Sequence, residues 1–179
     1  MAIYNSDRWT WFVGLGVASI VLGVLAWIDA MSVSLASVML LGIAIVVAGI
    51  FQIAHAISAR DWSGRLFALA GGCLYVLGGV LLMAEPVAGS IFITAVISIC
   101  MMIAGVARLA IAFSHRETGG WQLMALGGVV TLLIGILLYT SLPWSGLWLI
   151  GTFVAVELII AGVAWLQLGL AMRPARSIR

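Results

Sequence analysis

The sequence predicts an all-α integral membrane protein with six transmembrane helices, arranged as three parallel helical-hairpin repeats with pseudo-threefold symmetry. Hydrophobic residues make up 65% of the chain and charged residues 8%, which leaves more apolar surface than a soluble domain of this length buries. The apolar residues form six long stretches, and several markers recur at a fixed interval. These observations exclude an ordinary soluble enzyme and predict a chain that lies almost entirely in the bilayer.

Each of the six stretches is close to the roughly 20 apolar residues that a helix needs to cross the hydrocarbon core. They cover 9–28, 33–57, 63–84, 89–113, 121–140 and 146–171. Their residues do not alternate as those of β-barrel strands do. The first stretch ends at Trp27-Ile28-Asp29 instead of a small-residue cleavage site, so we expect it to be retained as a helix. Residues 1–179 therefore form one transmembrane domain.

Paired glycines seven residues apart recur at intervals of 56 residues and define the repeat. The three pairs are Gly16 and Gly23, Gly72 and Gly79, and Gly128 and Gly135. A period shared by several markers predicts tandem repeats over 9–60, 62–116 and 121–173. Each repeat crosses the membrane twice, so successive repeats have the same orientation. Since small residues let helix backbones approach closely, we expect these six glycines at helix-packing contacts.

A hydroxyl lies between the two glycines in every repeat, at Ser19, Tyr75 and Thr131. One interpretation is a hydrogen bond between helices, worth about 1 kcal/mol or less. The other is a set of three hydroxyls around a central polar path. The sequence leaves both interpretations open.

The arginines predict the orientation. All eight basic residues are arginine, and seven of them lie at the N-terminus, in the second and fourth loops, and in the C-terminal tail. The first and third loops carry Asp29 and Glu85, and the first, third and fifth loops contain no basic residue. The positive-inside rule then places both termini in the cytoplasm. Three arginines in the tail are too few to indicate nucleic-acid binding, so we expect them to anchor to lipid head groups.

Two charges inside the predicted spans are the main candidates for function. Glu157 lies in the middle third of the sixth span and Arg108 near the cytoplasmic end of the fourth. Their register separates them by roughly 12 Å of helix rise. Charges at this depth normally face protein or water, and we expect Glu157 to be largely buried. Structural pairing or snorkelling of Arg108, and a role in moving protons or a solute, both remain open.

Weaker polar candidates accompany these two. Gln52 occupies the position equivalent to Arg108 in the first repeat, and His55 lies one turn beyond it. Cys73 and Cys100 fall inside spans without any ligand spacing, so we expect neither a metal site nor a redox motif. No phosphate-binding loop, nucleophile elbow or zinc-protease motif occurs. We therefore predict no catalytic residues and no cofactor.

The chain resembles the HdeD-like acid-resistance membrane proteins, which consist of short tandem hydrophobic repeats. The resemblance extends over almost the whole chain and depends on the Trp121–Gly128 segment with Gly135, Ala104–Arg108 and Glu157–Ile159, with prolines at Pro86 and Pro143. The first repeat departs from the pattern, with Ala30 where a proline is expected. The resemblance implies a bacterial inner-membrane protein linked to acid or general stress.

Two classes of function follow from these observations. The first is a non-enzymatic stress protein that stabilises the membrane or docks a partner. The second is a conduit or carrier for protons or a small solute, which would use Glu157 and Arg108. The expected partners are the lipid bilayer and either further copies of the chain or another membrane protein. Polar residues converging on a water-filled path would favour the second class, whereas a dry, close-packed interior would favour the first.

Overall fold

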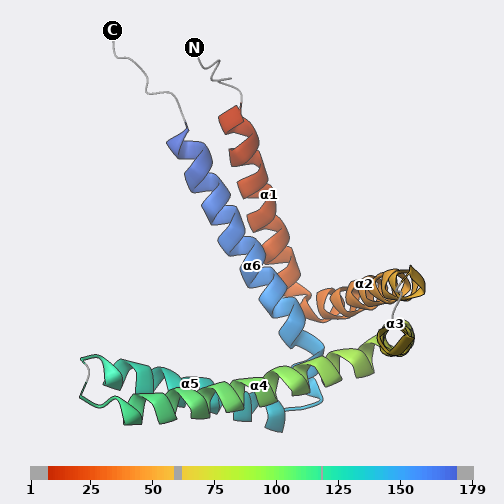
Figure 1. Cartoon of the computed structure of the whole chain (residues 1–179). Helices are drawn as coiled ribbons and strands as arrows, with labels where there is room; N and C mark the ends of the chain where they lie inside the picture. Colours follow the sequence, from red (N-terminus) through yellow and green to blue (C-terminus); the bar gives the residue numbers. More distant parts are fainter. Residues whose placement is uncertain (1–7, 59–61, 118, 173–179) are drawn as a thin grey trace, which may run out of the picture. The chain divides into compact units, whose positions relative to one another are not determined.

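All secondary structure in the described part of the chain is helical. The computed structural model describes residues 8–58, 62–117 and 119–172. Arg60 and Arg173, the last residues of two of the predicted repeats, lie outside these ranges. Its helices are α1 (Arg8–Ile28), α2 (Ala30–Ser58), α3 (Trp62–Ala84), α4 (Pro86–Ser114), α5 (Trp121–Thr140) and α6 (Trp144–Ala171) (Figure 1). The prediction of an all-α chain is confirmed.

All six helices of the described residues are long and apolar enough to cross a membrane, in agreement with the sequence. The candidate spans in the odd helices match the predicted stretches to within a residue, for example Trp9–Ile28 and Trp121–Thr140. Those in the even helices start up to three residues earlier than predicted, as in Pro86–Ser114. Proline is favoured in the first helical turn because its missing N–H has no intrahelical acceptor there, which explains the early start of α4.

The helix ends follow local rules. Asp29 accepts a hydrogen bond from the backbone N–H of Ser32 at 3.2 Å, which satisfies one of the free donors in the first turn of α2. Glu85 precedes α4 but makes no such side-chain bond. Gly120 precedes α5 with a φ of 96°, a left-handed conformation that glycine adopts without a steric penalty.

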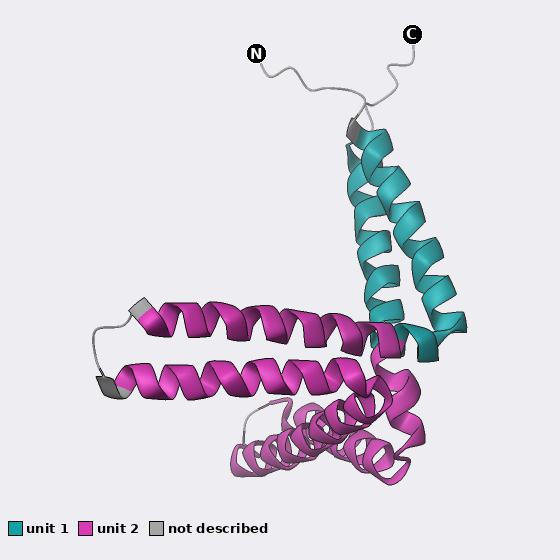
Figure 2. Ribbon diagram, turned by 90° about the vertical axis from the view of Figure 1, so that its right-hand side faces the viewer, with its two compact units in different colours: residues 1–33, 151–179 teal, residues 34–150 magenta. Residues whose placement is uncertain are grey.

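The chain divides into two compact units (Figure 2). The first contains residues 1–33 and 151–179, and its helices are α1 and most of α6. The second contains residues 34–150, with most of α2 and all of α3, α4 and α5. The first unit therefore brings together segments from the two ends of the described chain.

Glycines lie at close contacts between helices within each unit. A Cβ added to Gly16 on α1 would lie 2.8 Å from the carbonyl oxygen of Gly162 on α6. The same added atom at Gly72 on α3 would lie 3.1 Å from the Gly49 carbonyl on α2. At Gly128 on α5 it would lie 3.2 Å from the carbonyl of Gly105 on α4. Backbones meet directly at these points, as small residues in membrane helices allow.

The second glycine of every pair makes a similar contact about two turns further along its helix. A Cβ added to Gly23 would lie 2.9 Å from the Ala155 carbonyl oxygen, and one added to Gly79 would lie 2.6 Å from the Gly42 carbonyl oxygen. At Gly135 the added atom would lie 3.0 Å from the Ser98 carbonyl oxygen. All six glycines predicted at helix-packing contacts thus lie where the backbones of two helices approach closely.

The helices that these glycines join differ from the expected hairpins. The predicted repeats 9–60, 62–116 and 121–173 pair α1 with α2, α3 with α4, and α5 with α6. The glycine contacts instead join α2 to α3 and α4 to α5 in the second unit, and α6 to α1 in the first. The physical reason is that the glycines of each odd helix face the small residues of an even helix from a neighbouring repeat, and close approach requires both surfaces to be small.

Candidate functional site

Arg108 is held by the helix that pairs with its own. Its Nη1 donates a hydrogen bond to Thr131 Oγ1 at 3.1 Å, and the Thr131 hydroxyl in turn donates to the Gly127 carbonyl at 2.8 Å. Arg108 lies on α4 and Thr131 on α5. For Thr131, the interpretation as a hydrogen bond between helices is confirmed.

The residues at the equivalent position of the other repeats also reach across to a paired helix. Gln52 on α2 places its amide nitrogen 2.7 Å from the position that a Cβ of Gly71 on α3 would occupy. Trp165 on α6 stacks on Phe12 of α1, with ring centroids 5.6 Å apart. An amide, a guanidinium and an indole therefore serve one role in packing, which favours a structural function for Gln52 and Arg108.

Glu157 has a different environment. Its side chain is exposed on α6, so the expectation that it is largely buried is wrong. It lies in a shallow hollow with Phe153, Val156 and Ile160, and no described residue gives its carboxylate a hydrogen bond or an ion pair. Glu157 belongs to the first unit and Arg108 to the second. The sequence could not predict this, because periodicity gives the depth of a residue but not the partner of its face.

The three recurring hydroxyls do not share one environment. Thr131 binds Arg108, whereas Tyr75 is half exposed and lines an apolar cavity of the second unit. Ser19 belongs to the first unit. These placements give no support to a common polar path.

The remaining candidates lie on the surface. His55 is exposed near the end of α2. The other histidine of the sequence, His115, is also exposed, and its Nδ1 lies 3.1 Å from the Ile111 carbonyl oxygen. Cys73 and Cys100 are free and exposed. No group of three or more histidine, cysteine or acidic residues that could hold a metal occurs among the described residues.

A set of small hydroxyl residues in the second unit was missed by the sequence reasoning. Ser34, Ser90, Thr94, Ser98 and Ser145 are all 0% exposed. Ser98 donates to the Thr94 carbonyl at 2.7 Å, and Ser145 donates to the Leu138 carbonyl at 2.7 Å. The hydroxyl of Thr94 has no hydrogen-bond partner among the described residues. Ser34 and Ser90 are one 56-residue period apart, and this repeat was the signal that could have revealed them.

We expect Thr94→Val to stabilise the protein. A buried hydroxyl without a partner keeps its desolvation penalty, so replacing it by a methyl group should raise the free energy of unfolding by about 1 kcal/mol. Thr131→Val is the matched control, because it removes a hydroxyl that is bonded, and it should lower that free energy by about the same amount. Unfolding of the purified protein in mixed micelles measures both. A loss of stability in Thr94→Val would contradict the expectation.

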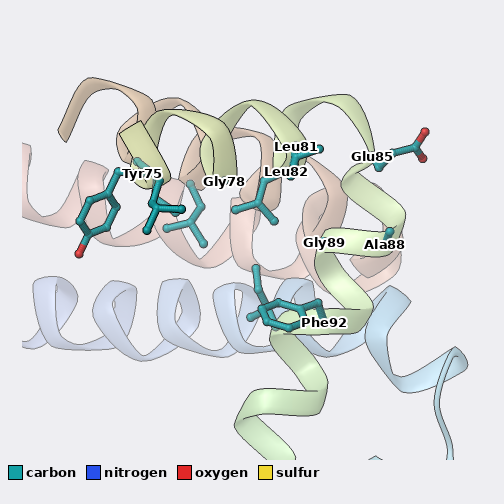
Figure 3. Close-up of a pocket in the computed structure, with 12 residues that line it drawn as sticks. Tyr75, Gly78, Leu81, Leu82, Glu85, Ala88, Gly89 and Phe92 are labelled. Atoms are coloured by element: carbon teal, nitrogen blue, oxygen red, sulfur yellow. The ribbon is translucent and has the colours of Figure 1, made fainter. Parts of the chain in front are cut away.

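The second unit contains an apolar cavity of about 610 Å³ between α2, α3 and α4. Its walls include Leu41 on α2, Leu82 on α3 and Phe92 on α4. Figure 3 shows Tyr75 at one end of the row of side chains and Glu85 at the other. The Glu85 carboxylate is directed away from the apolar side chains (Figure 3). Pockets of this size and character typically hold apolar ligands with a few polar contacts.

The first loop contains an acidic residue, Asp29, whose pKa is lowered by its neighbours. Hydrogen bonds from the side chain and the backbone of Ser32 hold the pKa of Asp29 below its ordinary value. Because the folded-state pKa is lowered, the stabilisation is present above the ordinary aspartate value and is lost as the pH falls through the lowered one. The cap of α2 therefore persists through mild acidification.

These features define a class, an all-helical protein whose long apolar helices pack in pairs through recurring small residues. A family profile described as a short repeat of unknown function (DUF308) matches the chain twice, over residues 14–84 and 71–140. The chain belongs to this family, which is the HdeD-like one. Comparisons with curated proteins and with solved structures gave no match.

The matched segments agree with the helix pairs. The first segment, 14–84, includes all of α2 and α3, and the second, 71–140, includes all of α4 and α5. The first segment starts within α1 and ends at the last residue of α3, and the second starts within α3 and ends at the last residue of α5. Each matched segment thus contains one close-packed pair of the second unit whole, together with the C-terminal part of the odd helix that precedes it.

Proposed function

We propose that this protein is a non-enzymatic, multi-pass protein of the bacterial inner membrane that acts in acid or general stress by docking a membrane partner and stabilising the surrounding bilayer. In this proposal both termini face the cytoplasm, and the three repeats are parallel and related by pseudo-threefold symmetry. The stress role follows from the HdeD-like resemblance. The docking role follows from the surface of α6.

The observation that carries the docking role is the exposed position of Glu157. Phe153 and Ile160 beside it are 57% and 63% exposed, so the carboxylate lies on an otherwise apolar face. An ionisable side chain within a span is costly against lipid and normally faces protein or water. A partner that covers this face, either a second copy or another membrane protein, would remove that cost.

The packing of the helices supports this proposal over a conduit. Arg108 is engaged by Thr131, and the recurring hydroxyls lie in different surroundings. The paired helices meet through close backbone contacts at their glycines, and at these points the backbones leave no room for a side chain between them. A proton or solute path needs polar groups that converge, and the residues that share the hollow of Glu157, among them Phe153, Val156 and Ile160, are apolar.

Survival of acid-shocked cells tests the docking role. A strain that lacks the protein should survive less well, and the wild type should restore survival. Glu157→Leu should fail to restore it, because the charged contact with the partner is lost. Cys100→Leu is the matched control, since Cys100 is exposed at the equivalent depth of α4, and it should restore survival fully. Full rescue by Glu157→Leu would contradict the docking role.

Proteoliposomes separate docking from conduction. With a pH gradient across the vesicle membrane, we expect wild type and Glu157→Gln to leak protons at the rate of protein-free vesicles. A flux that requires wild-type protein and is lost in Glu157→Gln would replace the proposal by the conduit.

A further inference from the structure

We propose that the apolar cavity between α2, α3 and α4 is a binding site for one acyl chain of a membrane lipid whose head group carries an ammonium. This inference goes beyond the docking role, because the cavity belongs to the second unit whereas Glu157 belongs to the first. It depends on the placement of α3 and α4 in a bilayer.

The walls of the cavity fit a hydrocarbon chain. Its volume of about 610 Å³ lies within the range of ligand pockets, about 300–1,000 Å³, and its walls are mostly aliphatic and aromatic. Tyr75 and Glu85, at its two ends, are ten residues apart, which corresponds to roughly 15 Å along a helix. The cavity is therefore elongated along α3. A chain that lies there would run roughly parallel to the spanning helices, as acyl chains of the bilayer do.

The position of Glu85 selects the head group. Among the described residues that line the cavity, Glu85 alone carries a charge. It lies between α3 and α4, where one candidate span ends and the next begins, so it is at the membrane boundary that a lipid head group occupies. Its side chain is exposed and makes no capping bond to α4. The carboxylate is thus available to an ammonium and would repel a purely anionic head group.

Gly78 keeps the cavity open. A Cβ added at Gly78, which lines the cavity, would meet no atom within 4 Å. A larger side chain there would fill the cavity without disturbing the contact between α2 and α3. Ala88 lines the cavity from α4 and offers a second blocking position on another wall. Gly127 on α5 also has open space around its added Cβ and does not line the cavity, so it provides a matched control.

Photolabelling in nanodiscs tests the site. The probes are phosphatidylethanolamine and phosphatidylglycerol with the same diazirine-labelled acyl chain, and mass spectrometry of peptides locates the labelled residues. We expect the ethanolamine lipid to label the cavity residues of α3 and α4 about three-fold more than the glycerol lipid, the size of effect that an exposed ion pair gives. Glu85→Gln should abolish this preference.

The blocking variants complete the test. Gly78→Trp and Ala88→Trp should each lower labelling of the cavity by both lipids by more than half, whereas Gly127→Trp should leave it unchanged. Equal labelling of the cavity by the two lipids in the wild type would overturn the assignment of the head group. Labelling that neither blocking variant changes would overturn the site itself. Neither result would bear on acid survival, which depends on Glu157.

Discussion

Gly79→Leu is expected to destabilise the protein by about 3 kcal/mol or more, the upper range of overpacking in a close-packed interior. A Cβ at this position would lie 2.6 Å from the Gly42 carbonyl oxygen and 2.9 Å from the Val46 nitrogen on α2. Because both atoms belong to the backbone of a helix, rotation of a side chain cannot relieve the clash. The two helices must separate, and their close contact is lost.

Gly78→Leu is the control for this change. Gly78 is the adjacent residue of the same helix, and its added Cβ meets nothing within 4 Å. The substitution should leave the free energy of unfolding within about 1 kcal/mol of the wild-type value, because leucine is also the better helix former. Unfolding in mixed micelles measures both variants. Equal stability of Gly79→Leu and Gly78→Leu would contradict the packing of α2 on α3.

The contrast between these neighbouring glycines shows which features of helix packing the sequence could predict and which it could not. Gly79 was predicted as a packing residue because it recurs with Gly23 and Gly135 at a fixed period. Gly78 does not recur in this way: Leu22 and Ile134 occupy the equivalent positions. Periodicity therefore separated the glycine in a helix contact from the glycine that lines a cavity. It did not identify which helix the contact joins.

The pairing of helices was beyond the sequence for a physical reason. Two consecutive helices joined by a short loop are the default neighbours, and each repeat contains such a pair. Both choices of partner put a glycine against a small residue, since α2 carries Gly42 and Gly49 whereas α1 and α3 each carry a glycine pair with the same seven-residue spacing. The choice depends on which faces of α2 carry these glycines relative to α1 and α3, and a one-dimensional period does not contain that information.

Only part of the candidate site could be predicted, because a period in the sequence does not identify the partner of a residue. Arg108 and Gln52 were identified by their polarity at membrane depth, but their partners Thr131 and Gly71 were not. The cavity could not be predicted, because its walls are ordinary apolar residues of spanning helices. Of its lining residues, Glu85 was known from the sequence only as a charge of an outer loop.

Cysteine accessibility should give an all-or-none result for the proposed topology. In a background with Cys73 and Cys100 replaced by alanine, we expect Glu85→Cys to react with a membrane-impermeant maleimide added outside intact spheroplasts. Glu117→Cys and Ser177→Cys should react only after the membrane is permeabilised. Seven of the eight arginines lie at the N-terminus, in or next to the second and fourth loops, and in the C-terminal tail, the parts of the sequence that include Glu117 and Ser177. Arginine in short loops favours retention in the cytoplasm.

The three positions together test orientation and the number of crossings. Glu85 and Glu117 flank α4 and are exposed, so a single spanning helix between them requires opposite accessibility. Glu117 and Ser177 flank α5 and α6, so two crossings require equal accessibility. Labelling of Ser177→Cys from outside in intact cells would contradict a cytoplasmic C-terminus. Equal labelling of Glu85→Cys and Glu117→Cys would show that α4 does not cross the membrane, and the arginine bias would then lose its meaning, because the arginines would no longer be separated from Asp29 and Glu85 by a bilayer.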